Sequence, residues 1–208
     1  VNEKIYNIFS LKEAEKNGTT IVHRSEMLAE ILRKKFNISV TGSHGKTTTT
    51  SLISHILIES GIDPTVVSGG ILKKLNTQAM LGKSDISVAE ADESDRSLLN
   101  LPTSIGVITN ISLEHLETYK DLDDIKNTFL QFLNNIAFFG KAIVCIDDQN
   151  IQSIITNTNI KTLKYGLSNE AEVTAKNIKL YPECSKYELW IKNKMLANIE
   201  LTIPGKHN

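Results

Sequence analysis

The feature that most constrains this chain is a buried strand that runs directly into a glycine-framed loop and then into a helix. Ile38 and Val40 are typical of the strand, and a helical pattern begins at Lys46. Between them, Gly42 and Gly45 let the backbone turn tightly, so that its N–H groups can point at phosphate oxygens. The order of strand, loop and helix therefore predicts a phosphate-binding site where the helix begins.

Two side chains at the start of this helix suit a bound nucleotide. Lys46 would lie along the β- and γ-phosphates, and the Thr47 hydroxyl would bind Mg²⁺. His44, inside the loop, is expected to cap the helix or to approach a phosphate. Only two residues separate Gly42 from Gly45, whereas the common pattern has four, so an ordinary helix N-cap turn stays open as an alternative.

Composition narrows the class of protein. The 208 residues carry a net charge of −1 with 23% charged residues, so no surface for nucleic acid is expected. No apolar run approaches the roughly 20 residues that span a bilayer, and no signal peptide opens the chain, so we expect no membrane insertion and a cytoplasmic location. Cys145 and Cys184 lack the spacing of a metal site. Because the chain starts at Val1 without a methionine and stops abruptly at Asn208, a fragment is expected.

Strand and helix patterns alternate as far as residue 165. Strands that are apolar on both faces and separated by helices indicate an α/β fold, with a mainly parallel sheet and helices on both of its faces. The expected strands lie near 20–22, 38–40, 65–68, 85–91, 105–109, 142–146 and 162–165. The expected helices begin at Arg24, span 46–60 and 121–136, and include a short one that ends at Ile155.

Some details of these elements are also predicted. Gly61 is expected to end the helix that begins at Lys46, and a polar loop is expected after Gly69-Gly70. Asp147 and Asp148 are interpreted as the start of the short helix. From Ala171 the apolar residues alternate, which predicts an antiparallel meander added to the sheet. The helix that begins at Lys46 is expected to bury Leu52, Ile53, Ile56 and Leu57.

Three polar segments follow separate strands, at 42–47, 90–95 and 110–115. Ligands of such sheets bind beyond the carboxyl ends of the strands, so the three segments are expected along one rim. Glu90 ends a buried strand and is predicted to hold Mg²⁺ directly or through water, although a solvated strand end remains an alternative. The acids that follow Glu90 would repel one another without a cation or donors, so they are expected to contact substrate or neighbouring loops.

The histidines carry weaker signals. His115 alone is more typical of a surface histidine than of a ligand, and imidazole is a soft ligand for Mg²⁺. His23 and His55 show nothing beyond packing or exposure.

Taken together, these segments resemble the Mur ligases, the ATP-dependent amino-acid ligases of peptidoglycan synthesis. In that family the phosphate loop is shortened as it is here. His23–Glu30 also resembles the family, so the resemblance runs from about residue 20 to the end, and it is nearest to the members that join L-alanine to UDP-N-acetylmuramate. The remaining matching segments are Gly42-Ser-His-Gly-Lys-Thr-Thr48, Glu90-Ala-Asp-Glu-Ser-Asp95, Thr109-Asn-Ile-Ser-Leu-Glu-His-Leu-Glu-Thr-Tyr119 and Pro204-Gly-Lys-His-Asn208.

The resemblance implies ATP with Mg²⁺, or Mn²⁺ in its place, and the substrates UDP-N-acetylmuramate and L-alanine. The γ-phosphoryl group would activate the sugar carboxylate, and the amine would attack the resulting acyl phosphate. Asn110 and Glu114 would position the loop that carries His115. By resemblance, the catalytic residues are Lys46, Glu90, Asn110 and His115, and the metal ligands are Thr47, Glu90 and His115. Substrate contacts are implied for Asp92, Glu93, Ser94 and Asp95. Nucleotide contacts are implied for Gly42, Ser43, His44, Gly45, Lys46, Thr47, Thr48, His207 and Asn208, the last two near the adenine.

The resemblance also implies a domain division. Residues 1–35 would be the tail of an N-terminal UDP-sugar-binding domain and its linker helix. Residues 36–208 would be the central ATP-binding domain, truncated at its end, with the C-terminal domain absent. A monomer or weak homodimer is expected, and the isolated fragment is expected to lack turnover.

Three residues depart from the family pattern. Glu114 and Glu117 stand where the family usually has shorter acids beside the histidine, and Arg96 stands where it usually has a small residue. Arg96 could pair with a neighbouring acid, contact a substrate phosphate or simply lie in solvent, and the solvent position is the favoured expectation. The alternatives are another Mur-type or folylpolyglutamate-type amide ligase, or a P-loop phosphotransferase or nucleotide-binding module. Amide formation that depends on L-alanine would separate a ligase from a phosphotransferase.

Overall fold

The strands of the protein form one mixed sheet. The structure is a computed structural model that describes residues 9–72 and 77–205. Ten strands lie in the order β10-β9-β8-β7-β6-β5-β1-β4-β2-β3. The run from β2 to β8 is parallel and both edges are antiparallel, which confirms the predicted α/β fold with an antiparallel extension. The strands are β1 Phe36–Thr41, β2 Thr65–Leu72, β3 Thr77–Met80, β4 Ile86–Glu90, β5 Thr103–Ile108, β6 Ile136–Cys145, β7 Thr162–Tyr165, β8 Val173–Leu180, β9 Ser185–Ile191 and β10 Lys194–Leu201.

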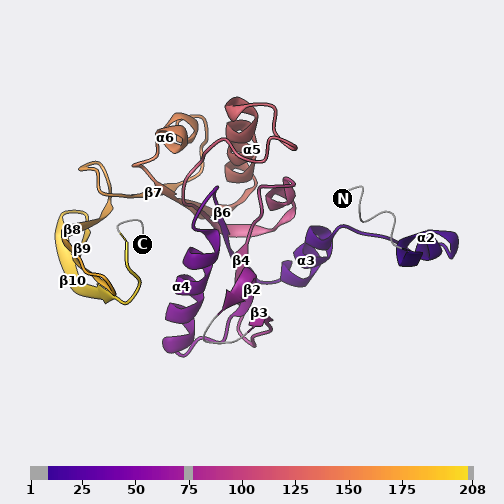
Figure 1. Cartoon of the computed structure of the whole chain (residues 1–208), viewed down its shortest axis with the longest axis horizontal. Coiled ribbons are helices and arrows are strands. Elements are labelled where there is room, and N and C mark those ends of the chain that lie inside the picture. Colours follow the sequence, from indigo (N-terminus) through magenta and orange to yellow (C-terminus); the bar gives the residue numbers. More distant parts are fainter. Residues whose placement is uncertain (1–8, 73–76, 206–208) are drawn as a thin grey trace.

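Helices cover both faces of this sheet (Figure 1). On one face, Val40, Val88 and Val107 pack against Ile53 and Leu57 of α4. The larger cluster on the other face includes Phe129 and Phe132 of α5, together with residues of α6. The helices are α2 Phe9–Lys16, α3 Arg24–Leu32, α4 Lys46–Glu59, α5 Leu122–Asn134 and α6 Gln149–Ile155, and a 3₁₀ turn, η1, spans Ser97–Asn100.

The central strand β1 positions the predicted site. It lies between β4 and β5, with Ile38 opposite Val88 on one side and Ile105 on the other. All three strands are parallel, so their carboxyl ends meet at one edge of the sheet. The segments that follow them are the three polar segments that the sequence places on one rim.

The buried face of α4 differs in part from the prediction. Ile53 and Leu57 pack on the sheet as expected, but Ile56 is 63% exposed. The inward stripe begins at Thr50 and continues through Ser54, both of which are buried. Helical spacing from Thr50 reaches Ile53, Ser54 and Leu57, so small polar residues take the place on the inward face that Ile56 was expected to fill, whereas Leu52 is half-buried as Ile53 and Leu57 are. Gly61, with a φ of 80°, follows the helix end as predicted.

The predicted strand at 20–22 is absent. This stretch is irregular, and Ile21 and Val22 are exposed. His23 then caps α3: its ring accepts the N–H of Ser25, and Glu26 accepts the N–H of His23. The view of His23 as an unremarkable histidine is therefore wrong. In Figure 1, α2 and α3 extend from the body as an arm.

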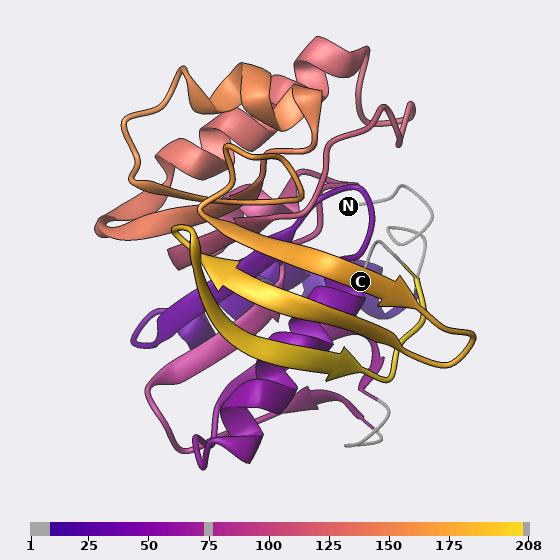
Figure 2. The same cartoon turned by 90° about the vertical axis from the view of Figure 1, so that its left-hand side faces the viewer.

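Other boundaries shift as well. The strand expected at 65–68 continues through Gly69 and Gly70 and pairs with β3, so the polar loop expected there contains a strand that was not predicted. β6 begins earlier than expected, at Ile136. The alternation after Ala171 forms the predicted meander, whose curved strands stand in front in Figure 2.

Candidate functional site

The phosphate loop requires glycine at two positions. Gly42 has a φ of 135°, and a Cβ built on it would lie 2.1 Å from Thr109 Oγ1. Gly45 has a left-handed backbone with a φ of 82° and is the N-cap of α4, with no side-chain cap bond. The expectation that His44 caps this helix is therefore wrong. The first N–H groups of a helix have no partner within it, so this end of α4 presents donors to an anion.

The segment after β5 holds the loop in place. The Asn110 carboxamide pairs with both polar groups of the His44 backbone, accepting its N–H at 2.9 Å and donating to its carbonyl at 2.9 Å. Thr109 Oγ1 also donates to the His44 carbonyl, at 2.6 Å, and Ser43 N–H donates to the Asn110 carbonyl. The N–H groups of Ser43 and His44 are thus occupied within the protein. An anion would instead meet the N–H groups at Gly45 and the first residues of α4.

A hydroxyl and a carboxylate side chain meet at the N-terminal end of α4. Thr47 Oγ1 lies 3.0 and 3.1 Å from the two oxygens of Glu90. Glu90 also accepts the N–H of Gly69 at 2.7 Å and the Ser68 hydroxyl at 3.3 Å. A Cβ at Gly69 would lie 2.8 Å from Glu90 Oε1, so a larger residue there would displace this carboxylate. Sequence reasoning missed the role of Ser68 and Gly69, although a Gly-Gly pair inside a strand signals a close backbone approach.

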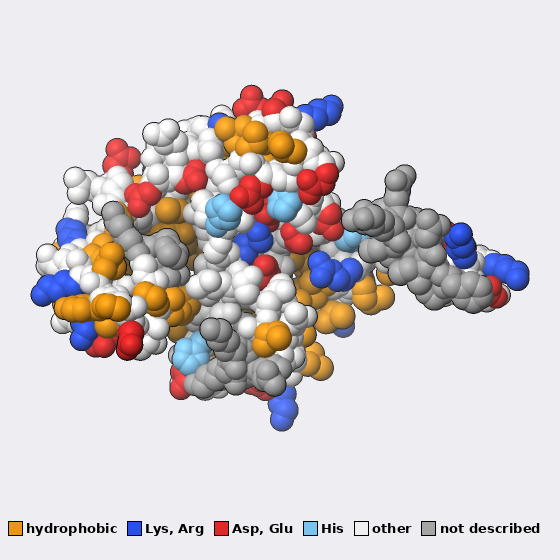
Figure 3. All heavy atoms as spheres, in the orientation of Figure 1, with side chains coloured by type: hydrophobic (Ala, Val, Ile, Leu, Met, Phe, Trp, Pro, Cys, Tyr) orange, Lys and Arg blue, Asp and Glu red, His pale blue; other side chains and the backbone are white. Residues whose placement is uncertain are grey.

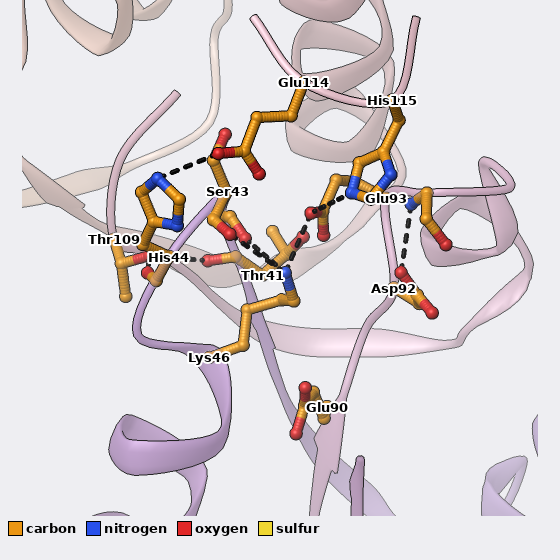
Figure 4. Close-up of polar contacts among 12 residues, drawn as sticks. Thr41, Ser43, His44, Lys46, Glu90, Asp92, Glu93, Thr109, Glu114 and His115 are labelled. Carbon is orange, nitrogen blue, oxygen red and sulfur yellow. Dashed lines mark hydrogen bonds and ion pairs between the residues drawn. The ribbon is translucent and has the colours of Figure 1, made fainter. Parts of the chain in front are cut away.

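Lys46, Glu93 and His115 form a second cluster (Figure 4). Lys46 Nζ donates to Glu93 Oε1 at 2.8 Å and to the Gly42 carbonyl at 2.8 Å. His115 Nε2 lies 3.5 Å from the same Glu93 oxygen. The side chain of Glu93 is only 2% exposed. Burial raises the pKa of the Glu93 carboxyl, against the hydrogen bond and charge of Lys46, which lower it. Glu93 Oε2 is buried and accepts no hydrogen bond from the described residues.

The other acids of the 90–95 segment mostly bond to their own loop. Asp92 Oδ1 accepts the N–H of Ser94 at 3.0 Å, and Asp95 Oδ1 accepts the N–H of Ser97 at 2.9 Å. Asp95 also lies 3.4 Å from His23 Nε2, so α3 is joined to this segment. Hydrogen bonds from Ser97 keep the pKa of Asp95 below its ordinary value in spite of burial. Contact with neighbouring loops, one of the two expectations for these acids, is therefore observed.

Arg96 has a side chain that is 37% exposed but is paired with an acid, so the favoured expectation that it simply lies in solvent is wrong. Its guanidinium donates to Asp124 at 2.7 Å and lies 4.7 Å from the centre of the Tyr119 ring. Asp124 lies in the first turn of α5. Arg96 therefore joins the acidic segment to that helix. The expectation failed because the direction of a loop side chain depends on partners that a single sequence does not reveal.

Of the two acids expected to start the short helix, only one does so. Asp148 does cap α6, accepting the N–H groups of Asn150 and Ile151. Asp147 instead accepts the N–H groups of Leu167 and Ser168, 20 residues or more along the chain. It therefore closes the turn after β7 and does not start the short helix.

The rim beyond the strands is crowded with charged groups. His44 Nε2 lies 2.9 Å from Glu114 Oε1, which joins the phosphate loop to the loop that carries His115. Figure 3 shows acidic and histidine side chains gathered in the middle of one face, between α4 and α5.

Of the other predicted nucleotide contacts, Thr48 lies in the first turn of α4. His207 and Asn208, expected near adenine, lie outside the described residues.

The oxygen atoms of Thr47 and Glu90 are ligands of the kind that a hard divalent cation such as Mg²⁺ prefers. Thr47 and Glu90 place hydroxyl and carboxylate oxygens side by side, and Mg²⁺ binds through one or two carboxylates with phosphates and waters supplying the rest. Within the described ranges, no three His, Cys, Asp or Glu side chains group as a complete metal site. A cation here would therefore depend on ligands from a nucleotide. No helix in the described part of the chain is long and apolar enough to cross a membrane.

Comparison with known proteins identifies the family of this chain. A family model, the Mur ligase middle domain, matches residues 40–208. The UDP-N-acetylmuramate–L-alanine ligase of Syntrophobacter fumaroxidans is 47% identical over 194 residues, which are 93% of this chain and 41% of that protein. This chain thus spans less than half the length of that relative.

Solved structures share the fold. A UDP-N-acetylmuramate-alanine ligase from Thermotoga maritima superposes with a TM-score of 0.81 at 24% identity, over 95% of this chain and 44% of that one. A MurF ligase from the same organism, solved in complex with ADP, gives a TM-score of 0.67 at 20% identity, over 86% and 45%. Because the family match covers most of the residues and includes the three segments that meet at the rim, this chain belongs to the Mur ligase family.

Proposed function

We propose that this chain is the ATP-binding part of a ligase that joins L-alanine to the carboxylate of UDP-N-acetylmuramate, with release of ADP and phosphate. One observation carries the proposal: Lys46 and the Thr47–Glu90 pair lie at the open N-terminus of α4, with His115 on the neighbouring loop. The similarity to an alanine ligase of Syntrophobacter fumaroxidans supports the choice of substrates, and the ADP complex of the Thermotoga ligase supports the nucleotide.

The chain's own residues have separable tasks in this proposal. The N–H groups at the start of α4 and the Lys46 ammonium bind phosphate oxygens and neutralise their charge. Thr47 and Glu90 would hold Mg²⁺, and His115 would hold a second ion. Bound ions would supply positive charge that polarises the γ-phosphoryl group; its transfer from ATP to the sugar carboxylate would leave ADP and an acyl phosphate, which the L-alanine amine would then attack with release of phosphate. Asn110 keeps the phosphate loop in shape through the His44 backbone. Asp92 and Ser94 remain candidates for contact with the sugar substrate.

Lys46 must change partner for this to happen. Its ammonium is bonded to Glu93 and to the Gly42 carbonyl, and its side chain is only 15% exposed. Phosphate oxygens arriving at α4 would compete with Glu93 for the ammonium. Glu93 would then be released toward His115, whose Nε2 already lies 3.5 Å away. In this proposal Glu93 serves the site through Lys46 and His115, and direct contact with substrate is left to its more exposed neighbours.

Titration with ATP and Mg²⁺ by calorimetry tests the nucleotide site. Lys46→Ala and Glu90→Ala should each weaken binding by about 10-fold or more, because each removes a charge-assisted contact. Lys141→Ala and Glu183→Ala, which change exposed residues away from the rim, are the matched controls and should bind as the wild type does. Unchanged affinity in both site variants would contradict the proposal.

A second assay tests the reaction class. UDP-N-acetylmuramate, ATP and L-alanine are supplied together, and the amide product is measured by mass spectrometry. Amide formation that requires L-alanine supports the ligase, in this chain or in a longer protein that contains it. A phosphorylated sugar nucleotide that accumulates as the final product, with no amide formed even when L-alanine is present, would instead indicate a phosphotransferase.

A further inference from the structure

Arg96 bonds both to the turn that follows His115 and to the helix α5 that comes after it. Its guanidinium donates to the Thr118 carbonyl and to Thr128 Oγ1, both at 3.3 Å, and to Asp124 at 2.7 Å. The same group lies over the ring of Tyr119, 4.7 Å from its centre. A planar guanidinium can bond in its plane and stack on its face at once, which an ammonium group cannot do.

The turn is bonded in return to the acidic segment. Tyr119 is 1% exposed, and its hydroxyl donates to the Glu93 carbonyl at 2.5 Å. Thr118 Oγ1 donates to the Ser94 carbonyl at 2.6 Å. Burial raises the pKa of Tyr119 to about 12, so its hydroxyl keeps the proton that this bond needs. Arg96, Thr118 and Tyr119 thus fasten the two segments together directly beside the Glu93 side chain.

Each of the two joined segments contains one residue with a left-handed backbone conformation. His115 has a φ of 55° and Arg96 a φ of 60°, in the left-handed region that is unfavourable for a residue other than glycine. Such conformations persist only where surrounding contacts determine them. At His115, the N–H groups of Thr118 and Tyr119 both donate to its carbonyl, at 2.8 and 2.9 Å. The position of the imidazole therefore depends on the turn that Arg96 holds.

We infer that Arg96 is a positioning residue: by clamping the 115–119 turn and α5 to the acidic segment, it fixes His115 beside Glu93 and Lys46. The inference rests on the proposed function, since it gives His115 a cation to bind. The guanidinium of Arg96 is engaged by Thr118, Tyr119, Asp124 and Thr128, so Arg96 acts on His115 through Tyr119 and the turn. A small side chain at position 96 would leave the Asp124 carboxylate without its guanidinium and the Tyr119 ring without its cover.

The test separates binding of the ion from binding of the nucleotide. Mn²⁺ affinity is measured by electron paramagnetic resonance in the presence of a non-hydrolysable ATP analogue, and affinity for the analogue alone is measured in EDTA. Arg96→Ala should weaken Mn²⁺ binding by about 10-fold, the lower end of the effect of groups that orient metal ligands. Binding of the metal-free analogue should change less than about twofold, because Lys46 and the N-terminus of α4 remain.

Three variants control for other causes. Arg96→Lys keeps the charge beside Asp124 but loses the planar donors, and should give an intermediate Mn²⁺ affinity. Asp124→Asn removes the charge partner with little change of shape, and decides the question if Arg96→Ala does not fold, as judged by circular dichroism. Arg33→Ala removes an exposed arginine that pairs with Glu30 on α3, and should behave as the wild type.

The outcomes distinguish the two proposals. Wild-type Mn²⁺ affinity in folded Arg96→Ala, or in Asp124→Asn where that variant decides, overturns the positioning role and leaves the proposed function intact. An equal loss of metal-free and metal-dependent binding also overturns it, since the effect would then be general. If the wild type itself shows no metal-dependent binding of the analogue, the proposed function fails and the inference fails with it.

Discussion

At the scale of single residues, the rim is built from side chains that bond to backbone groups of distant loops. Asn110 is the clearest case, because its carboxamide satisfies both polar groups of the His44 backbone. Such a bond fixes a loop without blocking the donors that a ligand needs. A carboxamide suits this task because it carries a donor and an acceptor side by side.

Asn110→Ala should lower the free energy of unfolding by about 1–2 kcal/mol, because two hydrogen bonds are lost at a partly solvated site. Nucleotide affinity should fall by about 10-fold as the phosphate loop loses its shape. Urea unfolding and calorimetric titration measure the two effects. Asn159→Ala, at an exposed loop asparagine, is the control. Wild-type nucleotide affinity in Asn110→Ala would show that the loop holds its shape without this residue.

Asp124 gives a prediction about pH. Its pKa is lowered below the ordinary 3.8, chiefly by the hydrogen bond from Arg96, so the folded chain favours its ionised form. The resulting stability is fully present above the unfolded-state pKa and is lost as the pH falls through the folded-state value. The difference in unfolding free energy between wild type and Asp124→Asn should therefore be largest near pH 7 and shrink below about pH 4.

Urea unfolding at a series of pH values measures this difference. Asp123→Asn, on the exposed side of the same helical turn, controls for the loss of a negative charge near the N-terminus of α5. A difference between wild type and Asp124→Asn that stays constant down to acid pH would contradict the role assigned to the Arg96 pair.

How far single residues can be predicted depends on what determines their direction. Lys46, Thr47 and Glu90 could be assigned to the rim, because a strand end and a helix start fix where their side chains begin. The pairing of Lys46 with Glu93 and the inward course of Arg96 could not. Both depend on loops whose conformation is set by residues more than 20 positions away.

At the scale of elements, the join between β1 and α4 permits very little variation. Gly42 lies against Thr109 Oγ1 and the backbone of Asn110, in a conformation with positive φ. Steric space and backbone conformation both require glycine there. Gly61, at the other end of α4, has a positive φ but open space around it.

Comparison of the two glycines predicts different costs for the same change. Gly61→Ala should destabilise the chain by roughly 1–2 kcal/mol, the cost of a left-handed alanine. Gly42→Ala should cost more, because the new methyl group also displaces Thr109, and nucleotide binding should be lost with it. Chemical unfolding of both variants measures the costs. Equal values would mean that the Thr109 side chain moves aside freely.

Element types were predictable because apolar periodicity reports burial, but boundaries and faces were less so. α4 shows why: its inward stripe uses Thr50 and Ser54, and Ser54 satisfies its hydroxyl by donating to the Thr50 carbonyl. A hydrophobicity pattern does not reveal a polar residue that is buried with its own partner. The early start of β6 and the strand β3 depended on pairing with neighbours, which local sequence does not specify.

At the scale of the whole molecule, the sheet has a weak seam. β7 and β8 are paired at a single position, Tyr165 with Val173, whereas the strands on either side are paired over several residues. The meander β8–β10 therefore adjoins the parallel part of the sheet through little backbone bonding. Local stability within a protein follows such differences in contact.

The single tryptophan, Trp190, lies on β9 and reports on the meander. In urea, the fluorescence change of Trp190 should have its midpoint at a lower concentration than the loss of far-ultraviolet circular dichroism, because the meander opens first. A saturating ATP analogue with Mg²⁺ should raise the second midpoint and leave the first unchanged. Coincident curves, shifted together by the ligand, would show that the ten strands unfold as one unit.

The rim joins segments that are far apart along the chain: Lys46 and Glu93 are 47 residues apart, and His44 and Asn110 are 66 apart. Closing such long loops costs chain entropy, so contacts of this kind slow folding. The central parallel strands must find their register before any of these partners can meet. A nucleotide that binds only the completed rim stabilises the folded chain by mass action. Nucleotide binding therefore stabilises only chains whose central strands are correctly paired. A chain with a slipped register would not bind nucleotide and would gain no such stability.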